Sequence, residues 1–196
     1  MREAKLSRET GETKISVELN IDGKGIYEIS TGNGMFNHLL AQLSRHGLID
    51  LKISAAGDKE VGWHHIVEDT AILLGRSFRQ ALGESRGITR IAHSIVPLDE
   101  ALSVVAVDFG GRGYAIINTD LSESDMGDLS STLVKHFLET LAIEGGFNLH
   151  VKVLAGINNH HKAESIFKAL ARAVRTALTL DERLSGDIPS TKGIIG

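Results

Sequence analysis

His64-His65-Ile66-Val67-Glu68 and His160-His161-Lys162-Ala163-Glu164 share the pattern His-His-x-x-Glu and begin 96 residues apart. The apolar residues that follow each motif at helical spacing repeat at the same distance, so that Leu74 corresponds to Leu170. Two such copies indicate an internal duplication rather than a chance match. We therefore expect the functional residues to lie where the two halves of the chain meet.

The pattern around the motifs predicts a β-β-α-β-α order in each half. Alternating apolar residues predict strands, the turn at 22–25 suggests that two opening strands form a hairpin, and apolar residues three or four apart predict helices. Each half would be a small sheet with two helices on one face, and two halves would form an α+β, two-layer α/β sandwich with one continuous core. We expect strands at 13–21, 26–30, 48–55, 101–109, 114–118 and 149–154, and helices at 33–46, 64–82, 128–144 and 160–180.

Residues 1–196 are expected to form a single domain, with a first half at about 8–86, a second half at about 88–181 and a C-terminal tail at 182–196. The net charge of −4 gives no basic field for nucleic acid or an anionic membrane. The absence of cysteine rules out disulfides and thiolate metal ligands. The sequence shows no signal-peptide pattern and no apolar run long enough to span a membrane, so we expect a cytoplasmic protein.

The repeated motif carries metal-ligand chemistry. Neighbouring helix residues point about 100° apart, so the paired histidines should serve two different ions, whereas residues three or four apart can share one. A histidine on a helix is usually solvated, and a glutamate at a helix start can simply complement the macrodipole. The duplication favours metal, and imidazole with carboxylate suits two octahedral ions such as Mn²⁺. The expected ligands are His38, His64, His65, Glu68, His136, His160, His161 and Glu164.

A second group of residues suits an anion. Ser190, Thr191 and Lys192 place two hydroxyls beside an ammonium in the tail, which favours a phosphate group. A frayed tail with incidental polar residues is the alternative. Taken alone, Arg112 would be a turn residue and Arg90 an exposed strand residue. The sequence contains neither a Walker motif nor a Rossmann fingerprint.

These motifs together resemble the imidazoleglycerol-phosphate dehydratase family over essentially the whole chain. The resemblance rests on Arg8-x-Thr10-x-Glu12-Thr13, His38-Leu39-Leu40-x-Gln42-x-x-x-Arg45-His46-Gly47, His64-His65-x-x-Glu68-Asp69, Pro97-Leu98-Asp99-Glu100-Ala101-Leu102, Gly111-Arg112, His136-Phe137, Leu154-Ala155-Gly156-x-Asn158-x-His160-His161-x-x-Glu164 and Pro189-Ser190-Thr191-Lys192-Gly193. The chain departs from the family's usual pattern at Asn37, at Gly62-Trp63 and, in the turn around Arg112, at Gly110 and Gly113. Asn37 and Trp63 would alter the hydrogen bonds around the metal histidines.

The resemblance implies a lyase of histidine biosynthesis that dehydrates imidazole glycerol phosphate to imidazole-acetol phosphate. It implies the same eight metal ligands, phosphate contacts from Arg90, Arg112, Ser190 and Lys192, and substrate contacts from Glu12 and His46 near the reacting carbons. Two Mn²⁺ per active site would hold the ring as a dimetal-bound imidazolate able to expel the hydroxyl. Glu12 could relay protons. Family members form homo-oligomers, trimers arranged in a shell of twenty-four subunits, with active sites between chains.

Two other functions fit the residues. A dinuclear metal phosphoesterase would use a metal-bound hydroxide and release inorganic phosphate. A non-catalytic metal-binding shell protein would need no arginine or tail cluster.

Overall fold

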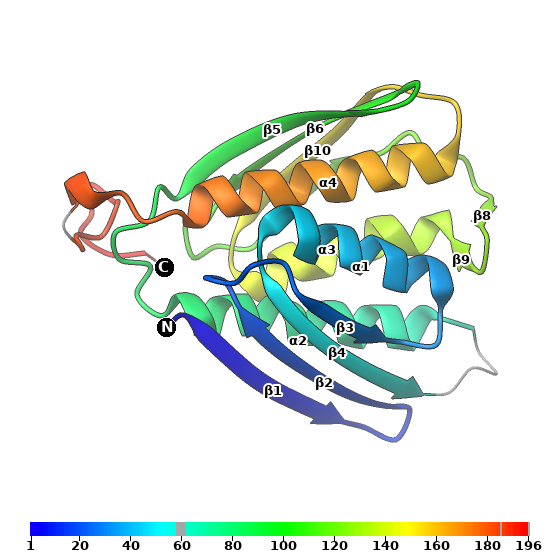
Figure 1. Cartoon of the computed structure of the whole chain (residues 1–196), viewed down its shortest axis with the longest axis horizontal. Helices are drawn as coiled ribbons and strands as arrows, with labels where there is room; N and C mark the ends of the chain where they lie inside the picture. Colours follow the sequence, from blue (N-terminus) through cyan, green and yellow to red (C-terminus); the bar gives the residue numbers. More distant parts are fainter. Residues whose placement is uncertain (58–61, 185, 196) are drawn as a thin grey trace.

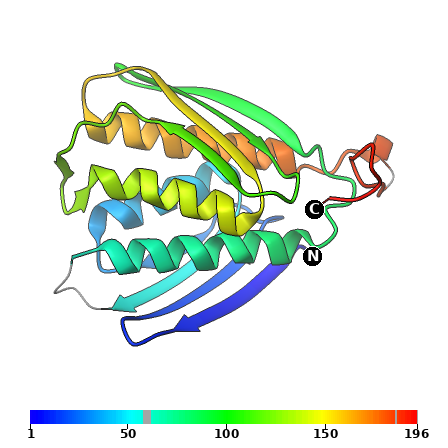
Figure 2. The ribbon, with the colours of Figure 1, turned by 180° about the vertical axis from the view of Figure 1, so that it is seen from behind.

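Two four-stranded sheets enclose a central layer of four helices in the computed structural model, which describes residues 1–57, 62–184 and 186–195 (Figures 1 and 2). The first half contains β1 (Glu3–Glu9), β2 (Thr13–Asn20), β3 (Tyr27–Ser30), α1 (Gly34–Gly47), β4 (Asp50–Gly57) and α2 (His64–Leu82). The second contains β5 (Ile91–Leu98), β6 (Ala101–Asp108), β7 (Tyr114–Asn118), the short β8 (Asp125–Met126) and β9 (Leu129–Ser130), α3 (Ser131–Gly145), β10 (Asn148–Ala155) and α4 (Asn159–Leu178), followed by the 3-10 turn η1 (Glu182–Leu184).

The α+β class and the duplicated half-domain sandwich are confirmed. Each half is a sheet with two helices on one face, and the halves stack with their helices inside and their sheets outside (Figure 1). The sheets have matching strand orders, β1-β2-β4-β3 and β5-β6-β10-β7. The strands β2 and β6 begin at residues 13 and 101, and the helices α2 and α4 at residues 64 and 159. We propose that the halves, at about 8–86 and 88–181, are copies of one ancestral unit.

The strand pairing differs from the expectation in two ways. Each half begins with an additional strand, β1 or β5, which forms the hairpin with the next strand. The expected hairpin between β2 and β3 is absent, because β4 lies between them and pairs antiparallel with β2 and parallel with β3. The alternation in β1 is weak because this edge strand buries only the small Ala4 fully.

One core joins both halves. The rings of Phe36 on α1 and Phe137 on α3 meet edge to face at 5.3 Å, and Phe137 stacks on Phe167 of α4 at 5.6 Å. At Gly75 the helices α2 and α3 approach so closely that an added Cβ would lie 2.8 Å from the backbone nitrogen of Gly145. The core therefore fixes the helices of the two halves against each other. None of the helices in the described ranges is long and apolar enough to cross a membrane.

Candidate metal centre

All four helices begin at the same end of the helix layer (Figure 1). His64 and His160 lie in the first turns of α2 and α4, while His38 and His136 lie in the second turns of α1 and α3. The duplicated motifs are therefore brought to one end of the molecule.

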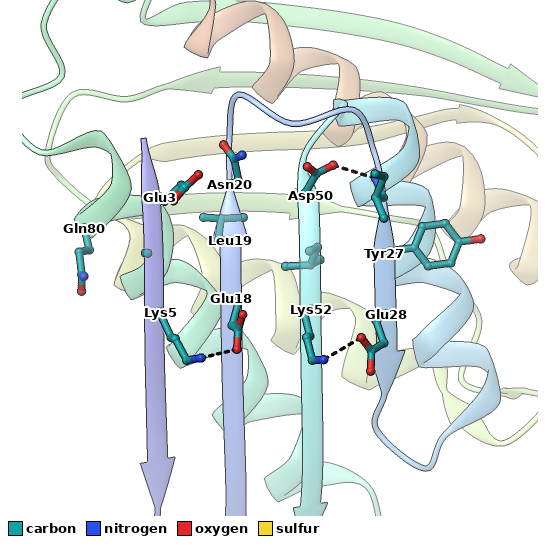
Figure 3. Close-up of a pocket in the computed structure, with 13 residues that line it drawn as sticks. Glu3, Lys5, Glu18, Leu19, Asn20, Tyr27, Glu28, Asp50, Lys52 and Gln80 are labelled. Carbon is teal, nitrogen blue, oxygen red and sulfur yellow. Dashed lines mark hydrogen bonds and ion pairs between the residues drawn. The ribbon is translucent and has the colours of Figure 1, made fainter. Parts of the chain in front are cut away.

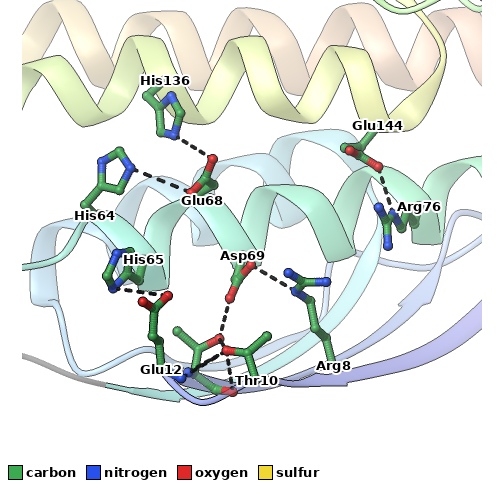
Figure 4. A network of polar contacts seen from close by, with 11 residues as sticks. Arg8, Thr10, Glu12, His64, His65, Glu68, Asp69, Arg76, His136 and Glu144 are labelled. Atoms are coloured by element: carbon green, nitrogen blue, oxygen red, sulfur yellow. Dashed lines mark hydrogen bonds and ion pairs between the residues drawn. The ribbon is translucent and has the colours of Figure 1, made fainter.

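The first cluster joins α2 to α3. His64 and Glu68 lie one turn apart on α2, with 3.6 Å between His64 Nε2 and Glu68 Oε2, and His136 Nε2 on α3 lies 3.5 Å from the other oxygen of Glu68 (Figure 4). The rings of His64 and His136 stack at 4.8 Å. His136 Nε2 is buried and has no hydrogen-bond partner within the described part of the chain. A buried ring nitrogen aimed at a carboxylate in this way suits an ion between them.

The second cluster joins α1 to α4. Glu164 Oε2 on α4 lies 3.0 Å from His38 Nε2 and 3.2 Å from His160 Nε2. Burial of Glu164 would raise the pKa of its carboxyl, but the neighbouring Lys168 ammonium and His38 outweigh burial and lower that pKa to about 2. This carboxylate is therefore ready to bind a cation at neutral pH. An open pocket of about 430 Å³ lies beside it, also lined by Met35.

Each cluster has the composition of a divalent metal site. Its two imidazoles and one carboxylate place their donor atoms within 4.8 Å of one another. Imidazole and carboxylate donors suit first-row divalent ions, and three donors leave positions on an octahedral ion for substrate or for ligands from elsewhere. The residues present therefore fit two ions, and both clusters take ligands from both halves of the chain.

The remaining two candidate ligands point elsewhere. The ring planes of His64 and His65 are inclined at 75°, and those of His160 and His161 at 86°. His65 Nδ1 lies 3.6 Å from Glu12 Oε2 (Figure 4), whereas His161 Nδ1 lies 2.7 Å from Glu100 Oε2.

Caps fix the helix ends that carry the histidines. The Asn158 side chain accepts hydrogen bonds from the backbone N–H groups of His160 and His161. Asp128, from the turn between β8 and β9, accepts bonds from the first two N–H groups of α1, at 2.7 and 3.0 Å. The side-chain oxygen Oδ1 of Asn37 accepts hydrogen bonds from the backbone N–H and the hydroxyl of Thr31, and so anchors the start of α1.

The expected anion-binding residues lie at the opposite end of the helix layer, around the start of β5, the β6–β7 loop and the tail (Figure 1). Arg90 has the left-handed backbone angle φ 72° just before β5 and is not an exposed strand residue, because its guanidinium is drawn inward to Asp108 at 2.7 and 3.1 Å. It also donates to the Pro189 carbonyl at 2.8 Å, next to Ser190. Arg112 is exposed. One chain therefore gathers the anion-binding candidates but holds them apart from the metal clusters.

The two expected catalytic residues lie apart from each other. Glu12 is in the turn between β1 and β2, beside α2. His46 is in the last turn of α1, where its Nε2 contacts Gln42 at 3.1 Å. Burial lowers the pKa of His46, and the positive charges of Lys168 and Arg172 on α4 lower it further.

A hollow larger than the one beside Glu164 lies away from the histidines. It has a volume of about 600 Å³ and lies on the outer face of the first sheet, beside Tyr27 (Figure 3). Four of its charged side chains form ion pairs, Lys5 with Glu18 and Lys52 with Glu28, each at 2.7 Å. This hollow offers no cluster of metal-ligating side chains.

Lys168 was not among the predicted site residues, although its ammonium nitrogen lies 2.7 Å from Glu164 Oε1. Its place one turn after Glu164 on α4 was the available signal. Glu100 belongs to one of the motifs that carry the family resemblance, but no role was predicted for it.

The fold and the paired clusters define a duplicated α+β protein with a candidate histidine–carboxylate metal centre. The family model of imidazoleglycerol-phosphate dehydratase matches residues 31–174. Proteins of that name from Dehalococcoides mccartyi and a Roseiflexus species are 51% and 50% identical to this chain over 194 residues, covering 99% of it and 97% and 98% of their own lengths.

Solved structures agree with these matches. The imidazoleglycerol-phosphate dehydratase of Staphylococcus aureus superimposes with a TM-score of 0.83 at 31% identity, covering 91% of this chain and 99% of its own. The Pyrococcus furiosus enzyme, in complex with (S)-C348, gives 0.82 at 33% identity, covering 96% and 99%. The chain belongs to the imidazoleglycerol-phosphate dehydratase family. It is a hydro-lyase of histidine biosynthesis, as the resemblance predicted.

Proposed function

We propose that this enzyme dehydrates imidazole glycerol phosphate to imidazole-acetol phosphate with two Mn²⁺ ions per active site. The pair of matched clusters carries this proposal, because each combines two imidazoles with one carboxylate and each draws on both halves. An imidazole ring has two nitrogens, so two ions can hold one ring from both sides.

The eight predicted ligands divide between the clusters and the two outward histidines. His64, Glu68 and His136 would hold one ion, and His38, His160 and Glu164 another. His65 and His161 point away from both clusters of their own chain. They would therefore bind the cluster ions of neighbouring chains, which would be shared between chains. When bound, the ions would act as Lewis acids that hold the substrate ring as an imidazolate and stabilise charge as the hydroxyl leaves.

The other site residues would bind and orient the rest of the substrate. Arg90, Arg112 and Lys192 would neutralise the phosphate, with hydroxyl donors from Ser190 and Thr191. Glu12 and His46 would contact the reacting carbons, and Glu12 would move the proton between carbon and the departing hydroxyl. The carboxylate of Glu12 is 60% exposed, which leaves it accessible to substrate.

The separation of these groups supports an active site built from more than one chain. The clusters lie near the start of α4 and the tail follows its end, and a helix of 20 residues is about 30 Å long. The short carbon chain that links ring and phosphate in the substrate cannot span that length. The phosphate residues of one chain would therefore complete the metal site of another.

The second sheet supports assembly into a homo-oligomer, which we propose is a shell of twenty-four subunits built from trimers in the cytoplasm. Its outer face carries Ile91 and Ile95, which are 62% and 56% exposed, and Val104 opposite Ile95. The equivalent positions of the first sheet, 88 residues earlier, include Ser7 and Ser16. An exposed apolar sheet face beside a polar counterpart is typical of a surface that another chain covers.

The test is to strip the protein of metal and supply imidazole glycerol phosphate with and without Mn²⁺. The proposal expects a metal-dependent ketone that retains its phosphate. Release of inorganic phosphate would instead identify a phosphoesterase. A protein that binds metal but catalyses no reaction, and whose metal binding is unchanged by loss of Arg90, would be a metal-binding shell protein.

A further inference from the structure

The two halves pair a carboxylate with the second histidine of each motif, but with different geometry. Glu12 and Glu100 occupy equivalent places, since each is the last residue of its hairpin turn, directly before the second strand, β2 or β6. Glu100 Oε2 lies 2.7 Å from His161 Nδ1, a hydrogen bond. Glu12 Oε2 lies 3.6 Å from His65 Nδ1, and this nitrogen has no hydrogen-bond partner within the described residues.

Glu100 is also fixed by the backbone. Its other oxygen, Oε1, accepts hydrogen bonds from the N–H groups of Ile157 at 3.2 Å and Asn158 at 2.9 Å. These residues form the loop that leads into α4, and Asn158 caps that helix. One side chain thus ties the loop, the cap and the His161 ring into one unit.

The chemistry of the pair sets the tautomer of the ring. A carboxylate can only accept hydrogen bonds, so His161 Nδ1 must carry the proton. The lone pair of Nε2 is then free to bind a metal ion, as in the carboxylate–histidine–metal arrangements common in metal sites. The nearest carboxylate oxygen to Nε2 among the described contacts is Asp99 Oδ2, at 3.7 Å, which is too far for a hydrogen bond.

We propose that Glu100 is a positioning residue that holds His161 with Nε2 ready to bind metal, and that Glu12, its counterpart, is released from this task to act on substrate. This inference rests on the proposed function, because it takes His161 to be a ligand. Glu12 differs in the ways such a division of labour requires: its carboxylate is more exposed, and among the described residues it accepts no hydrogen bond from a backbone N–H.

The Glu100→Gln variant tests the proposal with almost no change in shape. The amide oxygen of glutamine can still accept the bonds from Ile157 and Asn158, which turns its NH₂ group toward His161 Nδ1. Because that group donates, Nδ1 must accept, and the proton of the neutral ring then sits on Nε2. A protonated Nε2 has no lone pair with which to bind metal. We expect the Mn²⁺ affinity of the site that includes His161 to fall about 10- to 100-fold when metal-free protein is titrated and bound ion is followed by electron paramagnetic resonance.

Controls separate this role from others. Glu12→Gln is expected to bind Mn²⁺ like the wild type, and so is Glu28→Gln, on the outer sheet face. The double variant Glu100→Gln/His161→Ala should bind Mn²⁺ no more weakly than His161→Ala alone, because both changes remove the same ligand, His161. Wild-type affinity in Glu100→Gln, or additive losses in the double variant, would overturn the proposal. Failure of the wild type to bind Mn²⁺ would instead overturn the proposed function.

Discussion

His38 Nε2 on α1 lies 3.0 Å from Glu164 Oε2 on α4, although the two residues are 126 positions apart in the chain. His136 and Glu68 form the equivalent pair between α3 and α2, at 3.5 Å. In both pairs the histidine and the carboxylate come from different halves. The packing of the two halves therefore forms two clusters, neither of which either half could form alone.

Removal of one cluster carboxylate should remove one ion. We expect Glu164→Gln to lower the Mn²⁺ content measured by elemental analysis and to abolish most activity, because the neutral amide is a poor ligand for a hard divalent ion. Glu144→Gln is the matched control. Glu144 forms an ion pair with Arg76 at 2.8 Å, and this pair lies apart from the histidines (Figure 4). Unchanged metal content in Glu164→Gln would contradict the assignment of this cluster.

Mixed assemblies test whether one active site needs two chains. His136→Ala should lack a metal ligand and Lys192→Ala a phosphate contact, so each alone should be nearly inactive. Dissociating and reassembling a 1:1 mixture should restore up to roughly a quarter of wild-type activity, the share of sites formed by intact contributions under random pairing. A mixture as inactive as its parts would show that each chain forms its own site.

Arg90 should hold the tail as well as contact phosphate. Arg90→Ala loses the ion pair with Asp108 and the bond to the Pro189 carbonyl, so we expect faster proteolysis within 186–195. Loss of charge-assisted contacts worth about 1.5–3 kcal/mol should lower kcat/KM at least about tenfold. Arg175→Ala, an exposed arginine on α4, is the control. Equal digestion rates in both variants would argue against a tethered tail.

Asp128 links pH to stability through the cap on α1. Burial raises the pKa of its carboxyl, but the hydrogen bonds from the N–H groups of Met35 and Gly34 outweigh burial. The net result is a pKa below the usual 3.8. A lowered folded pKa gives stability that is present above 3.8 and is lost as the pH falls through the folded value. Asp128→Asn should therefore lower the free energy of unfolding of metal-free protein at pH 7 by about 0.3–1 kcal/mol, the range for an exposed negative charge at a helix N-terminus.

The same comparison repeated at lower pH is the check on this assignment. Denaturant titrations of wild type and variant should converge as the pH is lowered below 3.8. A difference that stays constant with pH would show that the charge of Asp128 does not contribute.

The sequence predicted the helices and the ligand types because helical spacing and the repeated motif are local signals. The first strand of each half was missed, since β1 buries only Ala4 fully. The pairing of β3 with β4 was also missed, because a turn such as that at Asp22 and Gly23 does not determine which strands become neighbours. Strand order depends on contacts between distant segments, which no local pattern records.

The candidate site was predictable in composition but not in arrangement. Residue types predicted the candidate metal ligands, and the resemblance supplied the proposed phosphate contacts. Which histidine meets which carboxylate depends on the packing of α1 on α4 and of α2 on α3. The inward turn of Arg90 toward Asp108 likewise depends on a hairpin strand, β6, that follows it in the chain.

The central claim is that two ions held by the paired clusters enable the dehydration. The most direct measurement is single-turnover reaction of metal-stripped protein with imidazole glycerol phosphate while Mn²⁺ is added stepwise. The account predicts no ketone phosphate without metal and a rate that reaches its plateau at two ions per active site. Full turnover in metal-free protein, or a plateau after one ion, would contradict it.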